Sequence, residues 1–140
     1  MIKRFHELSI EAFIQATEDE SRVMEAIENL LRRDLDEVQV FDSKGIHGNP
    51  IKIVKTAIRR EREIIDIISL WKELDFWKEA LKEADERLDE NLVFHVRVDK
   101  QSAYENDPRI WMEGESIKIR LKVASFPASR ERALEVLGDI

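Results

Sequence analysis

The stretch that decides the fold is Ile117-Lys118-Ile119-Arg120-Leu121-Lys122-Val123, in which apolar and basic residues alternate without a break. Successive side chains of a β-strand point to opposite faces, so the stretch predicts a strand with one buried face and one basic face. Residues 92–99 alternate in the same way and predict a second such strand, with His95 and Arg97 on its outer face. An antiparallel sheet that is covered on one face only accounts for both patterns.

The N-terminal segment continues this pattern. Residues 4–16 alternate and predict a strand whose buried side carries Leu8, Ile10, Ala12, Ile14 and Ala16. The next segment predicts a helix over about 18–33, because its apolar residues recur at helical spacing. Its start matches a capping box, in which Thr17 caps the helix and Glu20 bonds back to the free backbone N–H.

The rest of the chain completes an α+β pattern. Residues 38–42 and 51–58 predict two antiparallel strands joined by a glycine-containing turn. From about residue 60 the spacing becomes helical, and Asp75 suggests a break that gives two helices. Pro127 ends the last strand, and Ser129 caps a final helix that ends at Gly138. The predicted order is β-α-β-β-α-α-β-β-α, in one domain over residues 1–140, with helices packed on one face of a largely antiparallel sheet.

Composition limits the class of protein. The chain has 140 residues, 43% of them hydrophobic and 38% charged, which suits one domain with a proper core. The absence of cysteine excludes disulfides and thiolate metal sites and favours a cytoplasmic location. No apolar run approaches the length of a membrane span, and the N-terminus lacks a signal-peptide pattern. Asn and Gln together number only seven, a balance typical of thermophile proteins.

The charge pattern changes within residues 44–60, KGIHGNPIKIVKTAIRR. This basic strip has five basic and no acidic side chains, whereas the whole chain has a net charge of −7. Residues 1–43 and residues 61–90 each hold five basic and eleven acidic side chains. A basic strip in an acidic protein favours local contact with a polyanion, although a solvated hairpin followed by a half-exposed strand has the same pattern.

The predicted sheet adds further basic residues on its outer face. Basic outer faces are normal on half-covered sheets, so a solvated surface and a surface that follows phosphates both remain open. Lys52 is a further candidate for this face. The candidate phosphate contacts from the charge pattern are Lys52, Lys55, Arg59, Arg60, Arg97, Lys118, Arg120 and Lys122.

The aromatic residues fall into two groups. Trp71 and Trp77 lie on helical stripes and predict core or interface positions. Tyr104 and Trp111 lie in the loop-rich stretch 99–115 beside Lys100, Gln101 and Arg109. In such surroundings an exposed ring can stack on unpaired bases. Alternatively, Trp111 begins a strand and is buried.

No pattern in the chain requires catalysis. His6, His47 and His95 lie on three different elements without ligands at zinc spacing, so we expect no metal site. The usual glycine-rich nucleotide loops are missing, and no Ser-His-Asp arrangement can be argued from spacing. The sequence therefore predicts a protein that is not an enzyme and uses no cofactor.

Three segments of the chain form an ordered set of motifs. They are Ala16-Thr17-Glu18-Asp19-Glu20, Gly45-Ile46-His47-Gly48-Asn49-Pro50-Ile51 and Arg97-Val98-Asp99-Lys100-Gln101-Ser102-Ala103. Together they resemble an archaeal family described as RNA-binding proteins or predicted exosome subunits. The resemblance implies a fold like that of the fifth large-subunit ribosomal protein and a homodimer. It also implies that His47, Asn49, Lys100 and Gln101, which occupy matching motif positions, contact RNA.

These observations support three hypotheses. The first is a non-catalytic, cytoplasmic RNA-binding protein that is homodimeric and associated with RNA processing or the exosome. Its binding must be local and salt-dependent, because the protein is acidic. The second is a scaffold subunit whose acidic helical region 61–90, with Trp71 and Trp77, docks a protein partner of an RNA-processing assembly. The third is a hydrolase acting on RNA or nucleotides.

Overall fold

The structure is a computed structural model that describes residues 3–35, 38–44 and 50–139. Within these residues the α+β prediction is confirmed. Five strands form one open antiparallel sheet in the order β2-β3-β1-β5-β4. Two short helices, α4 and α5, were not predicted. The elements in chain order are β1 (Phe5–Ile14), α1 (Glu20–Leu31), β2 (Gln39–Lys44), β3 (Pro50–Ile58), α2 (Glu61–Trp71), α3 (Asp75–Lys82), α4 (Ala84–Arg87), β4 (Val93–Asp99), α5 (Lys100–Tyr104), β5 (Ser116–Val123) and α6 (Arg130–Gly138).

The chain divides into two compact units. Unit 1 comprises Met1–Ser9, Ile58–Val96 and Ile119–Ile140, and unit 2 comprises Ile10–Ala57 and Arg97–Lys118. Strands β1, β3, β4 and β5 each contribute residues to both units. Each unit is therefore built from segments that are distant in the sequence rather than from one consecutive stretch.

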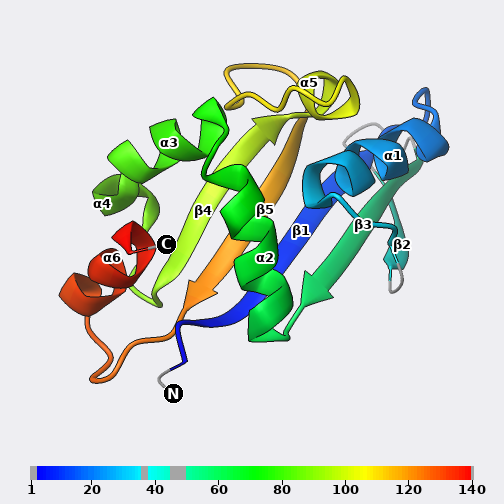
Figure 1. Ribbon diagram of the computed structural model, residues 1–140. Coiled ribbons are helices and arrows are strands. Elements are labelled where there is room, and N and C mark those ends of the chain that lie inside the picture. The colour runs from blue at the N-terminus through cyan, green and yellow to red at the C-terminus, as the bar shows by residue number, and fades with distance from the viewer. Residues whose placement is uncertain (1–2, 36–37, 45–49, 140) are drawn as a thin grey trace. The chain divides into compact units, whose positions relative to one another are not determined.

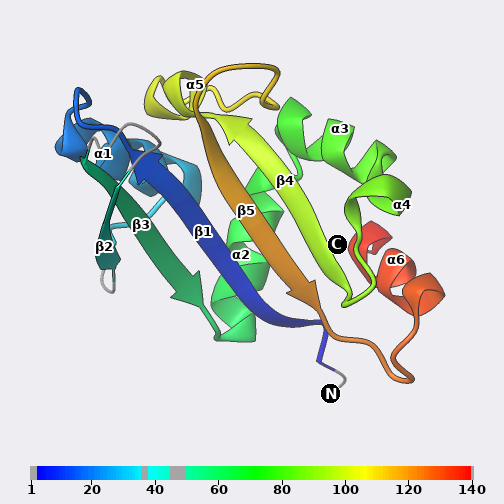
Figure 2. The same cartoon turned by 180° about the vertical axis from the view of Figure 1, so that it is seen from behind.

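Unit 1 is built around aromatic side chains. Helix α2 lies over the unit 1 parts of β1 and β5 (Figure 1), and the view from behind shows these strand segments in front of it (Figure 2). Trp71 and Trp77 are 0% and 2% exposed, which confirms the core alternative for both indoles. The Trp77 ring packs edge-on against Phe94, with ring centroids 5.4 Å apart. The predicted break before Asp75 is also confirmed, although Asp75 is the first residue of α3 and does not cap it.

The last helix of unit 1 begins as the sequence predicts. The Ser129 side chain accepts a hydrogen bond from the backbone N–H of Arg132, and α6 ends at Gly138. A side-chain oxygen at this position satisfies one of the free N–H groups at the start of a helix.

In unit 2, α1 covers the inner side of β1 and β3 (Figures 1 and 2). The predicted capping box is wrong, because Asp19 is the N-cap and accepts hydrogen bonds from the side chain and backbone N–H of Ser21. These bonds hold the pKa of Asp19 below its ordinary value of 3.8. Glu18 instead accepts a hydrogen bond from the backbone N–H of Gln15. Strand β2 pairs antiparallel with β3, as predicted, with Phe41 opposite Ile53.

Candidate nucleic-acid interface

The outer face of the sheet in unit 2 carries three pairs of one basic and one aromatic side chain. The first pair joins β2 and β3. Gln39 lies opposite Lys55, so the Lys55 side chain shares a face with that of Phe41, two residues along β2. The Lys55 Nζ lies 5.6 Å from the centroid of the Phe41 ring, and 45% of Phe41 is exposed. Lys55 also forms a 4.0 Å ion pair with Glu11 of β1, which extends the polar contacts of this face to the next strand.

The second pair joins β1 and β5. Phe13 lies on the outer face of β1, between the buried residues Ala12 and Ile14, and is 37% exposed. The Lys118 Nζ lies 5.3 Å from the centroid of the Phe13 ring. An exposed aromatic ring between strands that carry basic residues is therefore available to a planar ligand.

The third pair joins β4 to the segment that precedes β5. The chain at 109–111 bonds to the end of β4, since the Trp111 backbone N–H donates to the Arg97 carbonyl at 2.9 Å. This pairing places the Arg97 guanidinium 4.8 Å from the centroid of the Trp111 ring. The indole Nε1–H of Trp111 donates to the Gly114 carbonyl at 2.7 Å, which fixes the ring plane. Gly114 has φ of +84°, a left-handed conformation that favours glycine.

Two of these pairs border one hollow. Its volume is about 220 Å³, and its lining includes Phe13, Lys118, Arg97 and Trp111. We call the six side chains of the three pairs the stacking face. They are Phe13, Phe41, Lys55, Arg97, Trp111 and Lys118.

The structure places the residues of the basic strip in different surroundings. The expectation that Lys52 lies on the outer face is wrong, because its ammonium pairs with Glu20 of α1 at 3.5 Å. In unit 1, Arg59 pairs with Glu7 at 3.0 Å, and exposed Arg60 precedes the first residue of α2. Arg120 and Lys122 of unit 1 are exposed on β5, as predicted. Three basic residues of the strip thus pair with carboxylates on other elements.

Two of the three motif segments meet in unit 2. Lys100 forms an ion pair with Glu18, which joins the segment 97–103 to the segment 16–20. Lys100 is only 7% exposed, whereas Gln101 is exposed and donates to Glu105 at 2.9 Å. His47 and Asn49 lie outside the described residues.

Sequence reasoning missed Phe13 and Phe41 as site residues. Phe13 was detectable, because it is an aromatic residue in the polar phase of an alternating strand. Phe41 was not, because its position depends on the register between β2 and β3. Tyr104 is not one of the three pairs of the stacking face. Its ring lies beneath the guanidinium of Arg22, which is 5.5 Å from the ring centroid.

Among the described residues, no three His, Asp or Glu side chains come together in a way that could hold a metal ion. No helix in the described part of the chain has the length and apolar character needed to cross a membrane.

The fold and the stacking face together define an α+β protein with a basic and aromatic sheet surface. A family model described as RNA binding matches residues 7–123. The chain belongs to this RNA-binding family. It is 34% identical to an RNA-binding protein of Pyrococcus abyssi over 142 aligned residues, which cover 96% of this chain and 92% of that protein.

Other proteins are similar to this chain over nearly their whole length. The chain is 36% identical to an uncharacterized protein of Methanocaldococcus jannaschii, with 94% of this chain and 95% of that protein covered. Among solved structures, a DUF54 protein from Methanothermobacter thermautotrophicus matches with a TM-score of 0.84 and 29% identity. The match covers 97% of each chain, so the whole fold is shared.

Proposed function

We propose that the stacking face of unit 2 binds single-stranded RNA without catalysis. The observation that carries this proposal is the presence of three basic–aromatic pairs on one side of the unit 2 strands. Single-stranded RNA offers unstacked bases and a charged backbone, and proteins recognise it with aromatic rings and basic side chains. Membership of an RNA-binding family supports the same proposal.

The interaction energies favour replacement of a cation–π contact by a stacked base when RNA binds. An exposed cation–π contact is worth about 0.5–1 kcal/mol, whereas a base stacked on an aromatic ring is worth about 1–3 kcal/mol. A base that stacks on Phe13 or Trp111 therefore more than replaces the contact that the ring loses. The released cation, Lys118 or Arg97, is then free to meet a phosphate.

The proposal gives Arg97 and Lys118 the leading part among the candidate phosphate contacts. In the basic strip, Lys52, Lys55 and Arg59 each pair with a carboxylate, which a phosphate would have to displace. The protein carries a net charge of −7, which repels a polyanion outside the binding face. Binding should be modest in affinity and steeply weakened by salt.

The test is a salt series of RNA binding measured by fluorescence anisotropy. The probe is a fluorescein-labelled oligouridylate, titrated between about 50 and about 200 mM salt. The double variant Arg97→Gln/Lys118→Gln should bind about tenfold more weakly. Its salt slope should fall by about 1.4, because each single-strand phosphate contact contributes about 0.7.

The matched control is Lys78→Gln/Lys82→Gln, which removes the same charge from the exposed surface of α3 in unit 1. We expect it to keep the wild-type slope. Equal losses in both double variants would show that only net charge matters and would refute the proposed face. A perfectly paired duplex should bind more weakly than the single strand, because its bases cannot reach the rings.

We extend the proposal to the assembly and setting of the protein. The sequence resemblance supports a homodimer that takes part in RNA processing or associates with the exosome, and a fold like that of the fifth large-subunit ribosomal protein. The absence of cysteine favours a cytoplasmic location. The scaffold alternative depends on an exposed tryptophan in region 61–90. Burial of Trp71 and Trp77 counts against it.

A further inference from the structure

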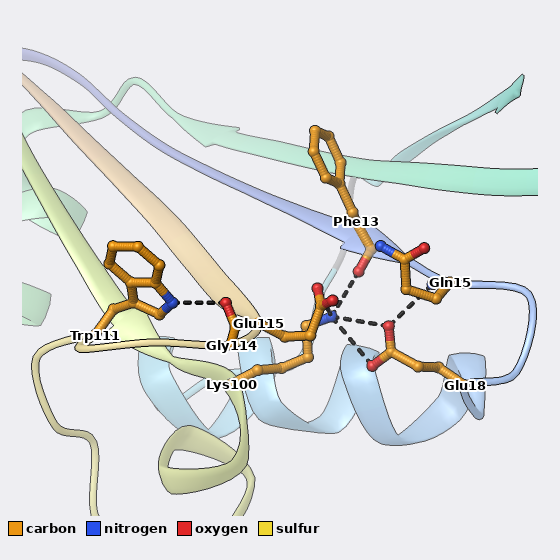
Figure 3. Close-up of polar contacts among 7 residues, drawn as sticks. All are labelled: Phe13, Gln15, Glu18, Lys100, Trp111, Gly114 and Glu115. Carbon is orange, nitrogen blue, oxygen red and sulfur yellow. Dashed lines mark hydrogen bonds and ion pairs between the residues drawn. The ribbon is translucent and has the colours of Figure 1, made fainter. Parts of the chain in front are cut away.

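Lys100 is a buried residue whose ammonium group bonds to the backbone of Phe13, a member of the stacking face. It begins α5, its side chain is 9% exposed, and it belongs to unit 2. Figure 3 shows its Nζ directed at oxygen atoms of three residues. It donates to the Phe13 carbonyl at 2.7 Å, to the two carboxylate oxygens of Glu18 at 3.0 and 3.1 Å, and to Glu115 Oε2 at 3.4 Å.

These partners belong to three separate segments of unit 2. Phe13 lies near the end of β1, Glu18 lies between β1 and α1, and Glu115 immediately precedes β5. Glu18 also accepts from the Gln15 N–H at 2.9 Å, and the Lys100 backbone N–H donates to the Glu115 carbonyl at 3.1 Å. One side chain thus joins the backbone that carries the Phe13 ring to the loop that carries Gly114 and Glu115.

The same loop fixes the second ring of the hollow. Gly114 accepts the indole N–H of Trp111, and it is the direct neighbour of Glu115 (Figure 3). A path of contacts therefore runs from Phe13 through Lys100 and Glu115 to Gly114 and Trp111. Both rings, Gly114 and Glu115 line the hollow of about 220 Å³.

We infer that Lys100 is a positioning residue for RNA binding, which sets the separation of the Phe13 and Trp111 rings without touching RNA. The inference rests on the proposed function of the stacking face. An ammonium group has three N–H donors, and the three partner residues of Lys100 account for all of them. Because all three donors are engaged, a phosphate that reached the ammonium would have to displace one of these bonds.

The consequence of removing the ammonium follows from its burial. Methionine at this position retains the length of the side chain but makes none of these hydrogen bonds. The Phe13 carbonyl and the two carboxylates would lose their shared donor, and the like charges of Glu18 and Glu115 would repel each other. The loop 113–115 and the end of β1 should then move apart, and the two rings with them.

The experiment compares wild type with Lys100→Met in the oligouridylate salt series. We expect Lys100→Met to bind about tenfold more weakly, with a salt slope equal to that of wild type. Lys82→Met removes the same charge from exposed α3 and should bind like wild type. Acrylamide quenching of tryptophan fluorescence gives a second measurement, because Trp71 and Trp77 are 0% and 2% exposed and leave Trp111 as the accessible indole. Quenching should increase in Lys100→Met alone.

The double variant Lys100→Met/Glu18→Gln guards against a loss of folding. It keeps the net charge of wild type and removes both members of the buried pair, a change that proteins tolerate better than removal of one. We expect the same tenfold loss and unchanged slope. A slope that falls by about 0.7 would show that Lys100 contacts a phosphate and would overturn the inference. Wild-type affinity with wild-type quenching in both variants would overturn it too, whereas failure of wild type to bind RNA would refute the proposed function itself.

Discussion

Phe13→Ala should weaken binding of the oligouridylate roughly 5- to 150-fold, the equivalent of about 1–3 kcal/mol for one stacked base. The ring is 37% exposed on the outer face of β1, and Lys118 lies over it. Removing the ring removes the surface on which a base can stack but leaves the cation in place. The salt slope should therefore stay as in wild type while the affinity falls, a combination that anisotropy titrations measure directly.

Phe126→Ala is the control for this prediction. Phe126 is 71% exposed and belongs to unit 1, outside the stacking face. It should bind RNA like wild type, and both variants should unfold at similar temperatures. Equal weakening of RNA binding by Phe13→Ala and Phe126→Ala would show that the position of an exposed aromatic residue does not matter. The stacking face would then have no special role.

Trp71→Ala should lower the free energy of unfolding by about 3–5 kcal/mol, the largest stability effect that we expect from one substitution. Trp71 is 0% exposed, and its ring lies 5.7 Å from Phe76 and 5.3 Å from Trp77 between ring centroids. Alanine would leave a large cavity among these rings, which relaxation fills only in part. Urea unfolding followed by circular dichroism measures the change.

Leu70→Ala provides the comparison within the same helix. Leu70 is the neighbour of Trp71 in the sequence but is 51% exposed. Its substitution should cost under about 1 kcal/mol, since about half of the residue remains in contact with water. A small effect of Trp71→Ala would contradict the burial of the indole and would restore the proposal that region 61–90 docks a partner.

The alternating sequences predicted their strands well because successive residues of a half-covered strand are buried and exposed in turn, and their polarity follows this alternation. Strand β5 buries Ile117, Ile119, Leu121 and Val123, as their spacing indicates. Helix α5 escaped prediction because five residues are too few to establish a helical period. The capping box failed because both Thr17 and Asp19 can cap a helix, and the local chain path decides between them.

The candidate site was less predictable, because pairing between distant segments determines it. The sequence identifies Arg97 and Lys118 as outward-facing residues, but it does not show which ring each one meets. For Lys52, the sequence suggests an unpaired cation in a basic strip. In the structure, however, Glu20 of α1 lies 3.5 Å from its ammonium. Such contacts depend on strand order and register, which periodicity within one segment does not encode.

The central claim is that RNA lies on the stacking face of unit 2, and photocrosslinking tests it most directly. An oligonucleotide that contains 4-thiouridine is irradiated with the wild-type protein, and the crosslinked residues are identified by mass spectrometry of the digested complex. Our account predicts crosslinks at Phe13, Trp111 or Phe41, because these rings would stack on the bases. Crosslinks confined to α2 and α3 of unit 1 would contradict it.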